Sequence, residues 1–154
     1  MTHKSLQKLI EILNKKLLPK EYFLKSKSSF AENIDYFIFQ SKVVDNWTGK
    51  QEYYLLKQNG KYVGLVFDMY PDQHWYMFKK YRGKGIMYSS LKDHILPYIL
   101  KTKGPIEITI SSWQSDPSTT QLAERLGFKK TGEKKYNEDT EIESREYKFI
   151  LRKQ

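Results

Sequence analysis

The stretch that decides the fold is 73–100, which reads QHWYMFKK, then YRGKGI, then MYSSLKDHILPYIL. Its first third is rich in aromatic residues and has no helical spacing, so we expect a strand there. Its last third carries apolar residues four or five positions apart: Ile86, Leu91, Ile95 and Ile99. This stripe predicts an amphipathic helix. The six residues YRGKGI must therefore turn the chain from a strand directly into a helix.

That turn combines two glycines, Gly83 and Gly85, with two cations, Arg82 and Lys84. The first N–H groups of a helix lack intrahelical partners, and the helix dipole adds partial positive charge there. Glycine also lets a ligand approach the backbone closely. These features predict a site for a phosphate or diphosphate. A simple strand-to-helix turn, with glycines for geometry and basic residues for solubility, would have the same sequence. Both interpretations, the anion site and the simple turn, stay open at this point.

The composition predicts one cytoplasmic domain over residues 1–154. This length is enough for a core, and no apolar run approaches the length of a membrane span. The N-terminal residues are charged throughout, unlike a signal peptide. The chain has no cysteine, which excludes disulfides, thiolate catalysis and thiolate-bound zinc.

The net charge of +9 is compatible with an anionic cofactor, a nucleic acid or a merely soluble surface. The lysines are scattered in short pairs, and no long basic tail is present. This distribution favours a folded surface over a nucleic-acid-binding arm. The abundant aromatic residues are more typical of a core and pocket lining than of base stacking.

The first half of the chain predicts a helix at 4–18, ended by Pro19. The polar segment 20–33 is expected to be a loop. Three strands should follow before the decisive stretch: 35–44, 52–58 and 61–70. The dipeptide Asn59-Gly60 joins the last two and is a strong hairpin signal.

The second half predicts a strand at 106–112, with three isoleucines on one face. Asp116 then resembles a helix N-cap, Pro117 suits the first helical position, and Gly127 suits the C-terminal end. Two closing strands are expected at 128–136 and 145–151. The order of elements predicts an α+β domain with a largely antiparallel sheet.

Two segments together resemble the GNAT superfamily of N-acetyltransferases. The family's phosphate loop reads Gln/Arg-x-x-Gly-x-Gly/Ala, and Arg82 and Gly85 take its first and fourth places. The second segment begins at Asp116-Pro117-Ser118-Thr119 and ends at Leu126-Gly127-Phe128. It is similar to the family's second cofactor segment, a helix that ends in Leu-Gly-Phe. The matching run covers roughly residues 52–136.

The resemblance implies a mixed, largely antiparallel sheet flanked by helices, with a splayed parallel strand pair that forms a cleft for acetyl-CoA. The backbones of three strand residues would hold the pantetheine arm: Tyr76, Met77 and Phe78. The diphosphate would lie on the loop, against Arg82, Gly83, Lys84, Gly85, Ile86 and Met87. Lys79, Lys80 and Lys84 would steer the phosphates. Asp116 belongs to the second cofactor segment, and Arg125 is a candidate for the adenosine 3′-phosphate.

Three positions depart from the family's pattern. Met87 stands where the loop motif usually ends in glycine or alanine, and its side chain would either crowd the diphosphate or point into the core. Asp116 replaces the frequent asparagine. Ala123 stands where many members carry a tyrosine that protonates the leaving thiolate.

Acetyl transfer needs a base that takes a proton from the amine and a group that polarises the thioester carbonyl. The candidate catalytic residues are His74, Asp72 and Tyr136, and an N–H near Phe78 would polarise the carbonyl. His74 has a suitable ordinary pKa, but a packed or exposed histidine fits the sequence as well. Tyr136 would replace the missing acid. No metal site is expected, because the histidines are scattered.

We therefore expect an acetyl-CoA-dependent N-acetyltransferase that acts by direct transfer on an amine of a small molecule or protein, as a single chain or a homodimer. A coenzyme-binding module without turnover and a basic nucleic-acid-binding domain are the alternatives. Neither a membrane nor a nucleic acid is an expected partner.

Overall fold

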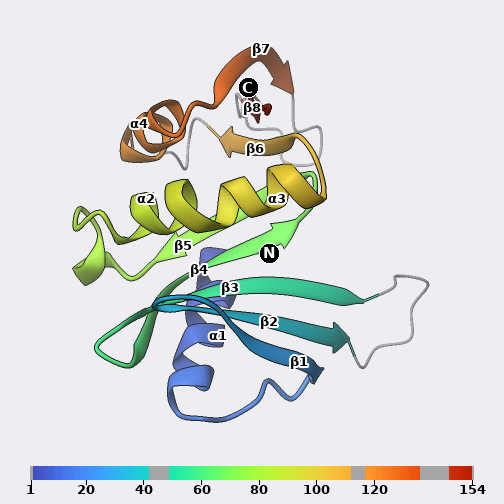
Figure 1. The fold of residues 1–154 in the computed structure, drawn as a ribbon, viewed down its shortest axis with the longest axis vertical. Helices are drawn as coiled ribbons and strands as arrows, with labels where there is room; N and C mark the ends of the chain where they lie inside the picture. Colours follow the sequence, from blue (N-terminus) through green and yellow to red (C-terminus); the bar gives the residue numbers. More distant parts are fainter. Residues whose placement is uncertain (1, 42–48, 112–116, 136–145, 154) are drawn as a thin grey trace. The chain divides into compact units, whose positions relative to one another are not determined.

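A computed structural model describes residues 2–41, 49–111, 117–135 and 146–153 (Figure 1). The chain forms two compact units. Unit 1 comprises residues 1–69 and 74–90, and unit 2 comprises residues 70–73 and 91–154. The single domain expected over 1–154 stays a prediction. In the described part of the chain, no helix is both long enough and apolar enough to cross a membrane.

Unit 1 is built on an antiparallel meander of β1 (Tyr22–Ala31), β2 (Ile34–Ser41), β3 (Lys50–Gln58) and β4 (Lys61–Met69), with most of β5 (Asp72–Met77) following in sheet order. The hairpin expected at Asn59-Gly60 is confirmed. Both residues have positive φ, +50° and +73°, as a two-residue type I′ turn requires. The strands predicted at 35–44, 52–58 and 61–70 correspond to β2, β3 and β4, although 42–44 lie outside the described residues.

The loop expected at 20–33 is wrong for most of its length, because β1 occupies it. β1 is the edge strand of the sheet, and most of its side chains are exposed. Its sequence therefore lacks the apolar alternation that indicates a half-buried strand. Its register against β2 also shifts twice, between Leu24 and Ser26 and between Ser29 and Ala31. Backbone pairing holds this strand in place, and such pairing leaves no trace in hydropathy.

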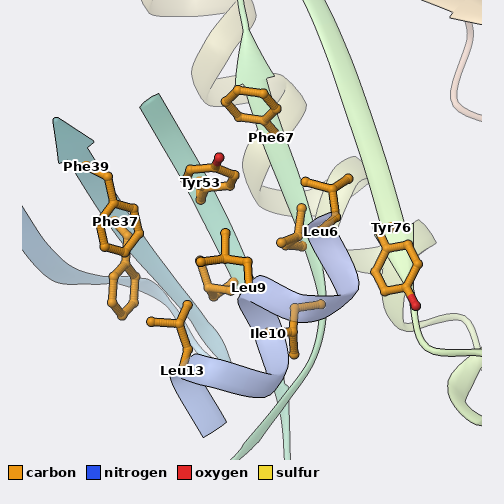
Figure 2. Packing of buried hydrophobic residues seen from close by; sticks show 11 residues of the cluster. Leu6, Leu9, Ile10, Leu13, Phe37, Phe39, Tyr53, Phe67 and Tyr76 are labelled. Carbon is orange, nitrogen blue, oxygen red and sulfur yellow. The ribbon is translucent and has the colours of Figure 1, made fainter. Parts of the chain in front are cut away.

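Helix α1 (His3–Asn14) covers one face of the meander (Figure 2). Leu6, Leu9, Ile10 and Leu13 are buried on it, as the spacing predicted. They pack against a set of strand residues with aromatic and aliphatic side chains: Phe37, Phe39, Tyr53, Leu55, Leu65, Phe67 and Tyr76. Burial of apolar surface contributes about 25 cal/mol per Å², so this cluster stabilises unit 1.

The helix ends at Asn14 and not at residue 18. Lys16 has φ +57°, and two backbone hydrogen bonds close the end: Lys16 N to Leu13 O (2.9 Å) and Leu17 N to Ile12 O (3.2 Å). These two bonds define a Schellman motif, which here ends the helix before Pro19.

The helix after the glycine loop is confirmed, with one irregular turn. It consists of α2 (Ile86–Ser90), the π turn η2 (Leu91–Ile95) and α3 (Leu96–Thr102). The five-residue spacing from Ile86 to Leu91 matches this wider turn. Pro97, the second residue of α3, has no N–H to donate to the carbonyl of Asp93. The boundary between the two units falls within this helix, after Ser90.

Unit 2 contains β6 (Ile106–Ser111), α4 (Pro117–Arg125), β7 (Lys129–Lys135) and β8 (Glu146–Leu151), with sheet order β6-β8-β7 and antiparallel pairing. The three isoleucines of β6 are buried, as their alternation predicted. Gly127 has φ +90° and ends α4, because Phe128 N donates to Ala123 O (3.1 Å).

The beginning of β5 pairs with β6 in parallel, with Asp72 opposite Glu107. No other pairing between these strands is recorded in the described residues. The predicted fold class is therefore confirmed: a mixed sheet of antiparallel strands with one parallel pair, flanked by helices. The cofactor cleft that the resemblance implies stays a prediction.

Candidate functional site

The end of β5 is held against β4 by backbone contacts. Phe78 N donates to Val63 O (3.0 Å), and the carbonyl of Tyr76 lies next to Gly64. A Cβ on Gly64 would come within 2.8 Å of that carbonyl oxygen and within 2.9 Å of the Met77 thioether. Glycine is therefore needed here so that β5 can approach closely. A glycine inside a strand pattern is the signal that sequence reasoning could have used.

After β5, the chain bends through the short 3-10 turn η1 (Lys79–Tyr81). Tyr81 N donates to Phe78 O (2.9 Å). The side chain of Arg82 then turns back, and its Nε donates to Met77 O (3.0 Å). Arg82 therefore fastens the loop to the end of the strand, a contact that its place in the motif did not predict.

Residues 83–87 have the backbone conformation that a phosphate-binding loop requires. Gly83 and Gly85 have φ +72° and +77°, and a Cβ on either glycine would meet no atom within 4 Å. Among the described residues, none accepts a hydrogen bond from the N–H groups of residues 83–87. The first return bond of the helix runs from Ser89 N to Gly85 O (2.9 Å). The loop thus presents unpaired donors and an open backbone at the start of a helix.

The same loop is strongly cationic. Residues 79–84 include four cations, and residues 73–92 contain no aspartate or glutamate. The cations are Lys79, Lys80, Arg82 and Lys84. They add a positive field to the partial charge of the helix N-terminus. Geometry and charge together suit an anionic group of the size of a diphosphate.

No protein-family model matches this chain, and no curated protein matches its sequence. Solved structures do match. One is the Salmonella typhimurium acetyl transferase that modifies the N-terminal serine of ribosomal protein L7/L12, with TM-score 0.56, 15% identity, and 68% of this chain and 64% of that chain covered. Another is a GNAT-family acetyltransferase from Bacillus anthracis, with TM-score 0.54, 18% identity, and 66% and 65% covered.

The chain has the GNAT fold. A third match, the microcin C7 self-immunity acetyltransferase MccE in complex with acetyl-CoA and AMP, agrees, with TM-score 0.54, 14% identity, and 66% and 60% covered. The chain spans less than two thirds of the length of these three structures. The resemblance inferred from YRGKGI and Leu-Gly-Phe is thus confirmed at the level of the fold.

In this GNAT fold, the Tyr76 hydroxyl and the Phe78 N–H each donate a hydrogen bond within the protein. The Tyr76 side chain is buried, and its hydroxyl donates to Gln7 Oε1 (3.1 Å) on α1. Burial raises the pKa of Tyr76. Because Phe78 N–H donates to Val63, the expectation that an N–H near Phe78 polarises a carbonyl cannot be met by Phe78 itself.

The candidate bases differ in their surroundings. His74 is half-buried, with its ring 6.4 Å from the ring of Phe67. Asp72, in unit 2, accepts a hydrogen bond from Gln73 N (2.8 Å) through Oδ1. Glu107, which lies opposite Asp72 on β6, has its Oε2 3.6 Å from Lys148 Nζ. The catalytic roles of His74 and Asp72 stay predictions.

For the other predicted site residues, the structure gives a position and an exposure or does not describe them. Met87 is half-buried in the first turn of α2, and Arg125 is exposed on the last turn of α4. Asp116 and Tyr136 lie outside the described residues. Ala123 is fully buried. Within the described residues, no three histidine, aspartate or glutamate side chains gather as a metal site would require.

Proposed function

We propose that this protein is an N-acetyltransferase that moves an acetyl group from acetyl-CoA directly to an amine in the cytoplasm. The observation that carries the proposal is the loop from Arg82 to Met87, with its left-handed glycines and unpaired N–H groups at a helix start. The GNAT fold supports it, because the MccE structure of that fold holds acetyl-CoA. The amine could belong to a small molecule or a protein.

The loop residues would bind the diphosphate of the coenzyme. The N–H groups of residues 83–87 are donors suited to phosphate oxygens, and the glycines remove side chains that would keep the phosphates away. Arg82 would act mainly by fixing the loop, since its Nε already binds Met77 O. Met87 would be accommodated if its half-buried side chain points away from these donors.

The edge of β5 that faces away from β4 would bind the pantetheine arm. Backbone groups along a strand point alternately to its two edges. Phe78 N–H points to β4, and the Tyr76 carbonyl lies beside Gly64 of the same strand. The groups of Trp75 and Met77 therefore point to the opposite edge. The N–H of Met77 is the donor there, because its carbonyl already accepts from Arg82.

The bound coenzyme would supply an activated thioester carbonyl. The protein would hold the amine close to it and take a proton from the ammonium, directly or through water. His74 is the first candidate for this base and Asp72 the second. With no cysteine in the chain, a direct transfer within a ternary complex is the simplest route.

A coenzyme-binding module without turnover is the second candidate. The observation that favours it is Ala123, which is fully buried where many GNAT enzymes carry a tyrosine. Thiol release from acetyl-CoA in the presence of a panel of amines separates the two. Coenzyme binding without amine-dependent release would establish the module.

The binding itself is tested by thermal unfolding with and without acetyl-CoA. At a hundredfold excess over the dissociation constant, binding should stabilise the protein by about 2.7 kcal/mol. Gly85→Leu should abolish this gain. The matched control is Gly60→Leu, because Gly60 has the same positive φ and the same open surroundings at a hairpin turn.

Both substitutions should cost similar stability, about 1–2 kcal/mol, from left-handed strain alone. A selective loss of the acetyl-CoA effect in Gly85→Leu therefore reports on the loop. No stabilisation of the unmodified protein by millimolar acetyl-CoA would contradict the proposal. If acetyl-CoA stabilised Gly85→Leu and Gly60→Leu equally, the coenzyme would bind outside the loop from Arg82 to Met87.

A further inference from the structure

The tip of the β3–β4 hairpin, Asn59-Gly60, holds the groups for a reaction of the chain with itself. Both residues are exposed, and a Cβ on Gly60 would meet no atom within 4 Å. In the described part of the chain, no hydrogen bond is recorded for the Asn59 side chain or for the Gly60 N–H. The side-chain amide and the main-chain nitrogen that follows it are therefore both accessible, with open space around them.

The main-chain nitrogen can attack the side-chain carbonyl of the asparagine before it. The bond from Gly60 N to Asn59 Cγ forms, the bond from Cγ to Nδ2 breaks, and ammonia leaves with the proton of the Gly60 amide. The product is a five-membered succinimide ring, which water then opens. Breaking the bond from Cγ to the ring nitrogen gives aspartate, and breaking the bond from the main-chain carbonyl carbon to that nitrogen gives isoaspartate.

Sequence and structure select Asn59 for this reaction. It is the one asparagine of the sequence that glycine follows, and glycine has no Cβ to hinder the attack. Asn33 is followed by Ile34, which is buried and β-branched. The Asn14 amide is held on the main chain of Tyr62 by two hydrogen bonds of 2.8 Å.

The hairpin turn limits the rate of the attack. Asn59 has φ +50°, and Gln58 pairs with Lys61 directly below the tip. The main chain between Asn59 and Gly60 must rotate out of the type I′ conformation before the nitrogen reaches Cγ. Since the tip is the end of the strand pairing, it can open locally without unfolding of the meander. We expect the reaction in the folded protein, but more slowly than in the unfolded chain.

We propose that Asn59 is a site of spontaneous deamidation, at which the folded protein loses ammonia and gains aspartate and isoaspartate. This inference is independent of the proposed function. The two products differ in their consequence. Aspartate keeps the turn, because Asp-Gly suits a type I′ turn. Isoaspartate adds a methylene to the main chain, so the two-residue loop no longer matches the strands and the β3–β4 hairpin is weakened.

The experiment incubates the folded protein at pH 7 and at pH 9 and follows its intact mass. The mass should rise by the difference between an amide NH₂ and a hydroxyl, and faster at pH 9, because the attacking nitrogen must lose its proton. Peptide mapping should locate the first gain at Asn59. A protease that cleaves before aspartate but not before isoaspartate should separate the two products.

Asn59→Asp is the matched variant, because it has no amide to lose and keeps the turn. It should show no mass gain while the original chain deamidates. Freshly purified Asn59→Asp should unfold at the same urea concentration as the fresh original chain, whereas the isoaspartate fraction of the aged original chain should unfold at a lower one. This comparison separates the added methylene from the added charge.

Two results would overturn the inference. One is a folded protein whose mass stays constant while the same chain in urea deamidates at Asn59, since the turn would then block the attack. The other is a first mass gain at Asn14 or Asn33. Neither result involves acetyl-CoA, so both leave the proposed function standing.

Discussion

Asp35 on β2 joins three elements of unit 1 through its two carboxylate oxygens. Oδ1 accepts from Lys57 Nζ (2.8 Å), and Oδ2 accepts from the Tyr62 hydroxyl (2.6 Å). The backbone of Tyr62 is bound in turn by the Asn14 side chain, with two contacts of 2.8 Å. A single acid thus connects β3 and β4, and through Asn14 the end of α1.

The pH dependence of stability should reflect this contact. Burial by itself raises the pKa of Asp35, but the hydrogen bonds from Lys57 and Tyr62 and the charge of Lys57 outweigh it, so the pKa lies below its usual value. Its contribution is therefore present above about pH 4 and lost as the pH falls through the lowered pKa. Asp35→Asn should destabilise the protein at pH 7 by about 2 kcal/mol.

Urea unfolding at pH 7 and at pH 3 measures this contribution. The stability difference between the unmodified protein and Asp35→Asn should shrink at the lower pH. The control is Asp93→Asn, an exposed acid, which should have little effect at either pH. A difference that is the same at both pH values would show that the loss is steric and not ionic.

The ends of elements are set by single residues in unusual conformations. Gly127 lies two residues after the end of α4, and glycine adopts the left-handed conformation there without strain. Lys16 lies two residues after the end of α1 and adopts the same conformation with a side chain. The two helices share the Schellman hydrogen bonds, but only α4 signals its end in the sequence. The end predicted for α1 at residue 18 is therefore four residues too late.

Lys16→Gly should therefore stabilise the protein. It relieves left-handed strain of about 1–2 kcal/mol, part of which is offset by the greater freedom of glycine in the unfolded chain. We expect a net gain of about 0.5–1 kcal/mol in urea unfolding. Lys15→Gly is the control. Lys15 has φ −82°, so glycine relieves no left-handed strain there and this variant should be less stable than the unmodified protein. A loss in both variants would mean that the Lys16 side chain stabilises the end of α1.

The whole molecule carries 27 basic and 18 acidic residues, a net charge of +9. In unit 1, part of this excess lies on the loop that we propose binds the coenzyme. The rest is distributed over several elements. A scattered charge attracts polyanions without reading their sequence.

Because a nucleic acid is not an expected partner, binding to duplex DNA should be no tighter than the non-specific range, a dissociation constant of about 10⁻⁴–10⁻⁶ M at physiological salt, and should not depend on sequence. Fluorescence anisotropy between 50 and 200 mM salt measures it, and affinity should fall steeply over this range. Nanomolar binding to a particular sequence, not displaced by CoA, would instead favour the nucleic-acid-binding alternative.

The sequence by itself determined the features that depend on neighbours along the chain. Apolar spacing located α1 and the helix after the loop, Asn59-Gly60 located a hairpin, and the glycines of YRGKGI predicted a turn from a strand into a helix. Each feature follows from the conformational preference of a few consecutive residues or from the period of one element. The GNAT fold could be inferred because these local signals occur in a specific order.

Only the tertiary structure decided the contacts between distant or irregular segments. β1 is held by pairing with β2, Gly64 admits the carbonyl of Tyr76, and Arg82 binds back to Met77 O. Lys80 and Lys84 meet on Tyr81 because a 3-10 turn and two left-handed glycines fold the loop onto itself. Hydropathy and spacing report which side of an element is buried. They carry no information on which backbone or charged group it meets once the chain has folded.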